Sequence, residues 1–96
     1  PYDTSFAVNQ FTYAILPSQG LSIPHGVGFV WCTMLWDMTW LLIDEFGFDP
    51  DLVNGTAGNN IALQLVTEAL KLQPCGPGFV DGRDAILQAD QILFDG

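Results

Sequence analysis

Positive charge is nearly absent from this sequence of 96 residues. Lys71 and Arg83 are its only cations, against 11 Asp and Glu residues, and the formal net charge is -9 at pH 7. A nucleic-acid partner requires basic side chains that neutralise phosphates in numbers, and an anionic membrane surface requires a basic cluster. The sequence therefore predicts no nucleic acid and no membrane among the partners.

Cysteine is also scarce, and the common catalytic and metal-binding motifs are missing. Cys32 and Cys75 are the only cysteines, and without a CxxC or Cys/His cluster we expect no metal ligands in this chain. The two cysteines could form a disulfide, because antiparallel helices would place them at similar heights, or remain two buried thiols. The motifs HExxH, GxSxG, GxGxxG and the P-loop are absent, so the chain alone should hold no cofactor.

Charged residues of either sign make up only 14% of the chain, whereas 49% is hydrophobic and 12% aromatic. This composition excludes disorder, but a typical domain carries about 25% charged residues. So few charges leave an apolar surface, which indicates missing neighbours. We expect residues 1–96 to form a single helical domain that is a fragment of a larger protein. Without its neighbours, such a surface would favour self-association.

The longest apolar run begins near Gly26 and ends near Ile43. It is too long for a strand and predicts a helix buried on several sides, with Gly47 as its C-cap. Polar residues fall on one narrow stripe of this helix: Thr33, Asp37 and Asp44. A membrane span is the alternative, since the run just reaches the length of one. Asp37 in its middle and the lack of flanking Lys or Arg favour a buried helix in a soluble protein.

Two amphipathic helices follow, and residues 1–24 form a largely irregular lead-in. We expect the second helix over Ile61–Leu72, capped by Asn59 or Asn60, and the third over Phe79–Leu93, with Asp81 suited to the dipole at its start. The expected buried face of the second helix consists of Ala62, Leu65, Val66, Ala69 and Leu72, widened by Leu63 and Leu70. That of the third helix consists of Gly82, Ala85, Ile86, Ala89, Ile92 and Leu93. Short connections make neighbouring helices antiparallel. The fold class is all-α, with three main antiparallel helices.

The loop before the second helix contains Asn54-Gly55-Thr56. This tripeptide fits the acceptor sequence for N-glycosylation. Asn-Gly is also a common turn sequence. With no eukaryotic source established by the sequence, the turn interpretation is preferred here.

His25 is the only histidine and lies between Pro24 and Gly26, at the expected N-terminus of the long helix. A helix N-terminus disfavours a positive charge, so a neutral imidazole is expected there, able to donate one hydrogen bond. That property suits the stabilisation of a developing oxyanion. Taken by itself, however, a lone histidine is more often an ordinary surface or capping residue.

Two stretches resemble the C-terminal helical lobe of fungalysin-type zinc metallopeptidases. They are "PHGVGFVWCTMLWD" and "GFDPDLVNGTAGNNIALQLVTEALKLQPCGPGFVDGRDAILQAD", and the similarity reaches back to "DTSFAVNQFTY". It implies a secreted, thermolysin-like enzyme of two lobes that hydrolyses peptide bonds. The implied zinc ligands, two histidines of HExxH and a downstream Glu, would belong to an N-terminal zinc-binding lobe outside this chain. The implied partners are that lobe and a peptide or protein substrate.

The resemblance assigns one catalytic residue, because the family has an H-x-x-G-x-V-W motif whose histidine hydrogen-bonds the tetrahedral intermediate. His25, Gly28, Val30 and Trp31 match this motif. Phe29 departs from it, since the family usually has an acidic residue there that could orient the imidazole. The chain alone is expected to be inactive. The alternative is a non-catalytic binding or assembly module that keeps the lobe fold.

Overall fold

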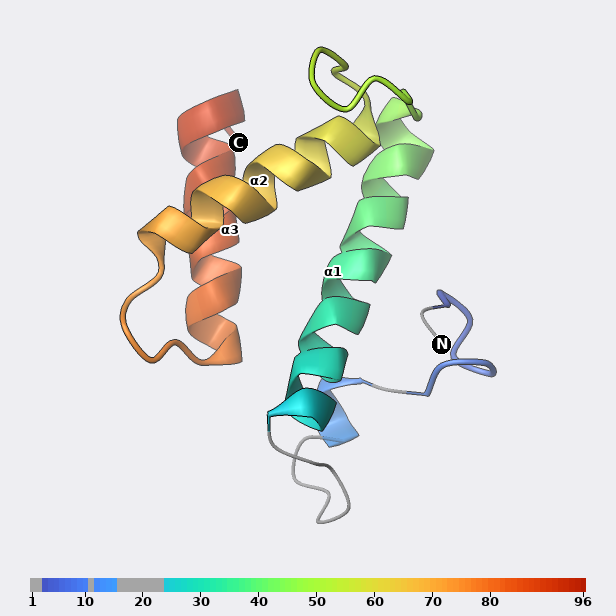
Figure 1. Cartoon of the computed structure of the whole chain (residues 1–96), viewed down its shortest axis with the longest axis vertical. Helices are drawn as coiled ribbons and strands as arrows, with labels where there is room; N and C mark the ends of the chain where they lie inside the picture. Colours follow the sequence, from blue (N-terminus) through green and yellow to red (C-terminus); the bar gives the residue numbers. More distant parts are fainter. Residues whose placement is uncertain (1–2, 11, 16–23) are drawn as a thin grey trace.

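The computed structural model describes residues 3–10, 12–15 and 24–96. In chain order they form a 3-10 helix η1 (Tyr13–Ile15) and three α-helices, α1 (His25–Phe46), α2 (Gly58–Leu72) and α3 (Phe79–Phe94) (Figure 1). No strand occurs in these ranges, so the all-α prediction is confirmed. η1 is the one helical turn that the described part of the lead-in contains; the rest of the predicted lead-in, residues 1–2, 11 and 16–23, lies outside the described residues.

The direction of the chain reverses from each α-helix to the next, as predicted, but the helices do not lie alongside one another. Figure 1 shows α2 running obliquely from the end of α1 across the middle of α3, and a loop then leads down to the start of α3. α2 therefore packs extensively against both other helices. The core lies between α2 and α3 and consists of Leu65, Ala69, Ala85 and Ala89, with Leu42, Ile61, Leu72 and Ile86 packed against it. The alanines let the two helices approach closely.

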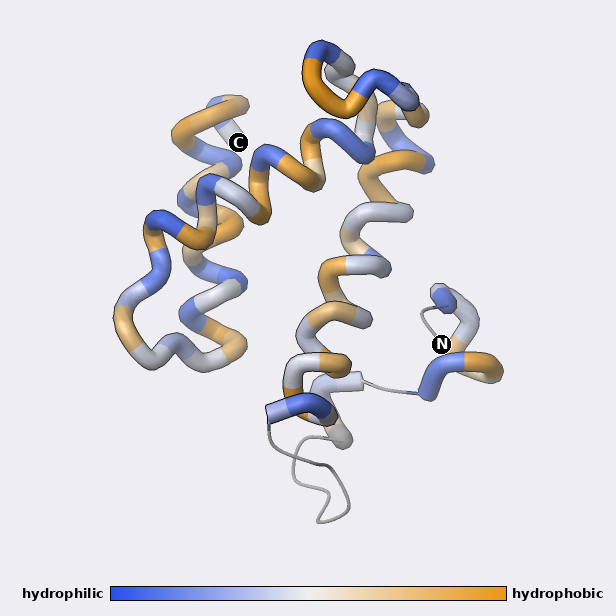
Figure 2. Tube along the Cα trace, viewed as in Figure 1, coloured by the Kyte–Doolittle hydropathy of each residue, from blue (hydrophilic) through white to orange (hydrophobic). Residues whose placement is uncertain are grey.

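The prediction that the long helix is buried on several sides is wrong for this chain. Val30 and Thr33 are the buried residues of α1, although Figure 2 shows that most of the helix is apolar. α2 covers one side of its C-terminal half, and the N-terminal segment covers part of another. Burial needs a neighbour on each side, and the remaining sides of α1 have none among the described residues.

The predicted polar stripe of α1 does not face solvent along its whole length. Thr33 is buried, with 2% of its surface exposed, and its Oγ1 accepts a hydrogen bond of 3.3 Å from Nδ2 of the buried Asn9. Asp37 is half-buried and Asp44 is exposed. The hydroxyl of Thr33 thus attaches the N-terminal segment to α1.

Among the described helices, α1 is the one that is long and apolar enough to cross a bilayer by length and composition. Core helices of soluble proteins meet the same criterion. Asp37 lies near the middle of α1, where a bilayer would disfavour it by roughly 2.5 to 3.5 kcal/mol. The bond from Asn9 to Thr33 also ties one side of the helix to its own chain. The soluble interpretation therefore remains our prediction.

The connection between α1 and α2 begins at Gly47, the predicted C-cap. Its φ of 79° lies in the left-handed region that favours glycine, and its N–H donates to the Ile43 carbonyl at 2.7 Å. At Gly58 a Cβ would collide with the Leu42 backbone. Glycine at position 58 therefore allows the close crossing of α1 and α2.

The predicted cap of α2 is wrong, because the helix begins three residues earlier, at Gly58, and Asn59 and Asn60 lie in its first turn. Asn60 Oδ1 accepts a hydrogen bond from the Ala57 N–H at 3.1 Å. Asn59 exchanges two hydrogen bonds with the Asp49 backbone, of 3.0 and 2.8 Å. These amides stabilise the preceding loop instead of capping a helix at Ile61.

The predicted buried faces of α2 and α3 are narrower or shorter than expected. Leu63 and Leu70 do not widen the buried face of α2, because they are 50% and 65% exposed. Ile92 and Leu93 of α3 are 55% and 40% exposed. In α2 both ends of the stripe, Ile61 and Leu72, pack against the core, and Leu63 and Leu70 lie on the other side of the helix. In α3 the obliquely crossing neighbour covers only a short length, so the C-terminal end of the stripe remains open.

Cys32 and Cys75 are both free and exposed, so the structure contains neither the disulfide nor a pair of buried thiols. The two cysteines would lie at similar heights only if the helices lay alongside one another. In Figure 1 the oblique α2 carries the loop that contains Cys75 away from α1.

Candidate functional site

His25 is the first residue of α1 and is exposed to solvent. Pro24 precedes it as the N-cap and offers no side-chain hydrogen bond, while the Pro24 carbonyl accepts the Gly28 N–H at 2.8 Å. A proline at this position limits the backbone directions from which the chain can enter the helix. The imidazole is thus exposed at the N-terminus of a long helix.

Gly28 lies one turn after His25, on the same side of α1. A Cβ at this position would have nothing within 4 Å, so packing against the described residues does not require glycine here. The glycine leaves free space beside the imidazole. A group bound next to His25 could occupy that space.

Val30 and Trp31 belong to the opposite, packed side of the motif. Val30 is fully buried. The Trp31 indole meets the Phe79 ring edge-on, with 5.3 Å between ring centroids, and lies against Gly82 of α3. Tyr13 of η1 contacts the same Phe79 ring at 5.6 Å. These aromatic contacts fix the start of α1 against the start of α3, and with it the position of His25.

The H-x-x-G-x-V-W motif therefore divides into an exposed half and a packed half. His25 and Gly28 face open space, whereas Val30 and Trp31 attach the helix to the rest of the fold. Sequence spacing alone could not separate these roles, because it does not show where α3 lies.

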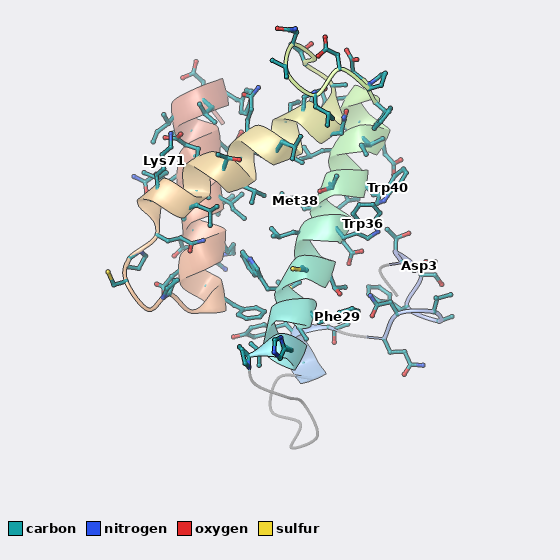
Figure 3. The ribbon with its side chains drawn as sticks, viewed as in Figure 1. Asp3, Phe29, Trp36, Met38, Trp40 and Lys71 are labelled. Atoms are coloured by element: carbon teal, nitrogen blue, oxygen red, sulfur yellow. The ribbon has the colours of Figure 1, made fainter. Side chains whose placement is uncertain are left out.

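Phe29 lies near the lower end of α1 in Figure 3 and is half-buried. It occupies the position where the fungalysin resemblance leads us to expect an acidic residue. A phenyl ring cannot accept a hydrogen bond from the imidazole, so Phe29 contributes packing and not polarity to the mouth of α1.

A metal site does not fit the residues that the structure describes. No group of three or more His, Cys, Asp or Glu side chains in these ranges could hold an ion. One carboxylate oxygen, Asp37 Oδ1, is buried without a hydrogen-bond partner among them. A single carboxylate does not make a metal centre.

The sequence reasoning missed an apolar hollow between α1 and α2. Trp36 and Trp40 stack edge to face at 5.8 Å on one side of α1 (Figure 3) and are 38% and 41% exposed. They line a cavity of about 450 Å³ together with Thr39, Ile43, Phe48, Leu52, Asn59, Ala62, Leu63 and Val66. The low charge content was the available signal, but it could not locate this surface.

Comparison with known proteins identifies the family of this chain. The sequence model of the "Fungalysin metallopeptidase (M36)" family matches residues 1–96. The chain belongs to the fungalysin family of metallopeptidases. The resemblance drawn from the sequence is thereby confirmed.

Three relatives illustrate the similarity. The chain is 47% identical to extracellular metalloproteinase 2 of Arthroderma gypseum and 46% identical to extracellular metalloproteinase 2 of Trichophyton tonsurans. It is 44% identical to extracellular metalloproteinase MEP of Neosartorya fischeri. Each match covers 100% of this chain but only 16% of the relative. The relatives are named as extracellular, which confirms the expectation of secretion at the level of the family.

Proposed function

We propose that this chain is the C-terminal helical lobe of a secreted zinc metalloendopeptidase and that it supplies His25 to the catalytic cleft. Membership of the fungalysin family and the extracellular names of the relatives support this proposal. The chain spans 16% of the relatives' length, so the zinc-binding lobe would belong to the remainder of the polypeptide. Peptides or proteins would be the substrates.

His25 would stabilise negative charge on the peptide carbonyl oxygen during hydrolysis. A neutral imidazole donates one hydrogen bond, which strengthens as charge develops on the acceptor. The observation that supports this role is the division of the motif into an exposed and a packed half. His25 is exposed, and Gly28 beside it has open space around it. Trp31 holds the helix against Phe79 and Gly82 of α3. The group is therefore accessible and its backbone is fixed, as preorganised stabilisation requires.

Zinc would activate water for attack on the peptide bond in the complete enzyme. The described residues of this chain do not fit a zinc site, so the lobe would contribute binding surface and His25 and leave the metal to its partner. The isolated chain should neither bind zinc nor hydrolyse protein. Stoichiometric zinc binding in a metal titration, or turnover of casein by the isolated chain, would contradict this division of roles.

Substitution of His25 tests the catalytic role in the full-length protein. Removing one oxyanion donor lowers kcat by roughly 10- to 1000-fold, so His25→Ala should reduce kcat in that range with little change in KM. Gln64→Ala, at an exposed position of α2, is the control and should retain full activity. An unchanged kcat in His25→Ala would remove His25 from the site.

A non-catalytic binding or assembly module is the second candidate, and Phe29 is the observation that favours it. Without an acidic residue at this position, nothing at position 29 can orient the imidazole. The sequence of the full-length protein decides between the candidates: HExxH and a downstream Glu support the enzyme, and their absence supports the module.

A further inference from the structure

We infer that Asn54 is an acceptor for an N-linked glycan. The tripeptide Asn54-Gly55-Thr56 is the single Asn-x-Ser/Thr sequence in the chain, and it lies in the loop between α1 and α2. Asn54 and Thr56 are exposed on either side of Gly55, which is buried. The two side chains that the modification requires are thus displayed, while the residue between them anchors the loop.

The turn interpretation of this tripeptide and its modification do not exclude each other. Asn-Gly is favoured in turns where one or both residues adopt a positive φ. Among the described residues, positive φ angles occur only at Gly47, Gly76, Asp95 and Gly96. Asn54 and Gly55 are therefore not selected for left-handed conformations. Residues 52–54 nevertheless form a turn, closed by the Gly55 N–H, which donates to the Asp51 carbonyl at 3.0 Å, so the turn interpretation preferred from the sequence is confirmed.

Packing explains Gly55 but not Asn54. A Cβ at Gly55 would lie 2.5 Å from Asn60 Oδ1 and 2.6 Å from the Asp51 carbonyl oxygen. At position 54, the backbone N–H donates to Asp51 Oδ1 at 3.0 Å, which any residue except proline could do. The side chain adds a hydrogen bond of 3.4 Å from Asn54 Nδ2 to Asp51 Oδ2. The amide of Asn54 is nevertheless exposed, and it lies two residues before the exposed Thr56.

The attachment replaces one hydrogen of Asn54 Nδ2. The amide nitrogen forms a bond to the anomeric carbon of a lipid-linked oligosaccharide diphosphate, and the lipid diphosphate leaves while the amide releases a proton. Nδ2 keeps its second hydrogen, which can still donate to Asp51. The fold of the loop therefore tolerates the modification.

The surroundings of Asn54 give the glycan a physical effect. Val53 is 87% exposed and Leu52 is 62% exposed, and a bulky hydrophilic group on the next residue would cover this apolar loop. The loop lies at the end of α1 opposite to His25 (Figure 1). Since α1 has 22 residues, the separation is about 33 Å at 1.5 Å per residue, so the glycan would leave the candidate site open.

The inference requires a secretory route that supplies the oligosaccharide donor. The relatives described above are extracellular proteins of Arthroderma, Trichophyton and Neosartorya, which are fungi and therefore eukaryotes. It does not depend on His25 or on proteolysis, so the glycan and the proposed enzymatic function can fail separately.

The test is glycan mapping on the full-length protein secreted from a eukaryotic host. A glutamate-specific protease cuts after Glu45 and Glu68 and releases residues 46–68. Treatment with peptide N-glycosidase in heavy-oxygen water should convert Asn54 to a heavy-oxygen-labelled Asp, detected by mass spectrometry. A digest without the glycosidase corrects for spontaneous deamidation at Asn54-Gly55.

Matched variants define the outcome. Asn54→Gln and Thr56→Ala should abolish the label and the corresponding shift in gel mobility, whereas Thr56→Ser should retain them because serine also completes the acceptor sequence. A reference glycoprotein secreted by the same cells shows that the donor is present. An unlabelled Asn54 alongside a glycosylated reference protein would overturn the inference.

Discussion

At the scale of single residues, the contact between Trp31 and Gly82 determines how α1 meets α3. A Cβ at Gly82 would lie 2.8 and 3.0 Å from two atoms of the Trp31 indole. The indole is itself held against Phe79. There is consequently no room for a larger residue at position 82 unless the aromatic cluster moves.

Gly82→Ala should destabilise the fold by about 1 to 3 kcal/mol, the usual cost of overpacking a close contact. Gly28→Ala is the matched control. It has open space around the new methyl group, and replacing a helical glycine by alanine stabilises by roughly 0.5 to 1 kcal/mol. Urea unfolding followed by circular dichroism measures both. Destabilisations of the same sign and size would show that Trp31 does not pack as described.

Asp51 provides a residue-scale prediction about pH. Backbone N–H groups of Asn54 and Val53 donate to its carboxylate and lower the pKa of Asp51 below its usual 3.8. These bonds therefore favour the folded loop above about pH 3.8, and their contribution is lost as the pH falls through the lowered pKa. NMR titration of the Asp51 carboxyl carbon should give a lower pKa in the folded protein than in a peptide of residues 49–55. Equal values would contradict the hydrogen-bonded loop.

At the scale of elements, the entry of α2 depends on the contact between Gly58 and the backbone of Leu42. A flexible side chain can move aside, but a helix backbone cannot do so without moving the whole helix. The first turn of α2 is also fixed by the Gly58 N–H, which donates to the Gly47 carbonyl at 2.8 Å. The crossing of α1 and α2 therefore has little freedom.

Gly58→Ala should destabilise more than Gly82→Ala, by more than about 3 kcal/mol, because the added methyl meets main-chain atoms. Thr67→Ala, at an exposed position of the same helix, should change stability by less than about 0.7 kcal/mol. The same urea unfolding experiment compares them. A small effect of Gly58→Ala would mean that α2 can move away from α1 at little cost.

The elements themselves were largely predictable from the sequence. Gly47 and Gln73-Pro74 correctly mark the ends of α1 and α2, since their backbone preferences are local. The start of α2 was not predictable, because Asn59 and Asn60 make their hydrogen bonds back to Asp49, Asp51 and Ala57 of the preceding loop. For the candidate site, the sequence identified His25, but only the packing of Trp31 showed which half of its motif is open.

At the scale of the whole molecule, the chain is less compact than an independent domain of its size. Its radius of gyration is 14.2 Å, compared with about 12.5 Å for a typical domain of this length. Large apolar side chains remain exposed on all three helices, among them Leu41, Leu70 and Leu87. This agrees with a chain that covers 16% of its relatives' length and has further surface for a partner.

The isolated chain should therefore self-associate. Sedimentation velocity over a range of concentrations should show an increase in average mass, and Trp40→Lys should reduce it by disrupting the exposed pair with Trp36. Val80→Lys changes the net charge equally at an exposed position of α3 and is the control. A chain that remains monomeric at every concentration would contradict the prediction.

The sequence by itself determined the three helices, the C-terminal ends of α1 and α2, and the family, because helix periodicity, glycine and proline positions and a long specific motif are local properties. Tertiary structure decided which faces are buried, that the cysteines stay apart, and that His25 faces open space while Trp31 is packed. These outcomes depend on the oblique path of α2, which is set by the close contact of Gly58 with Leu42. The crossing direction of two helices depends on contacts between residues far apart in the sequence, and no local pattern specifies it.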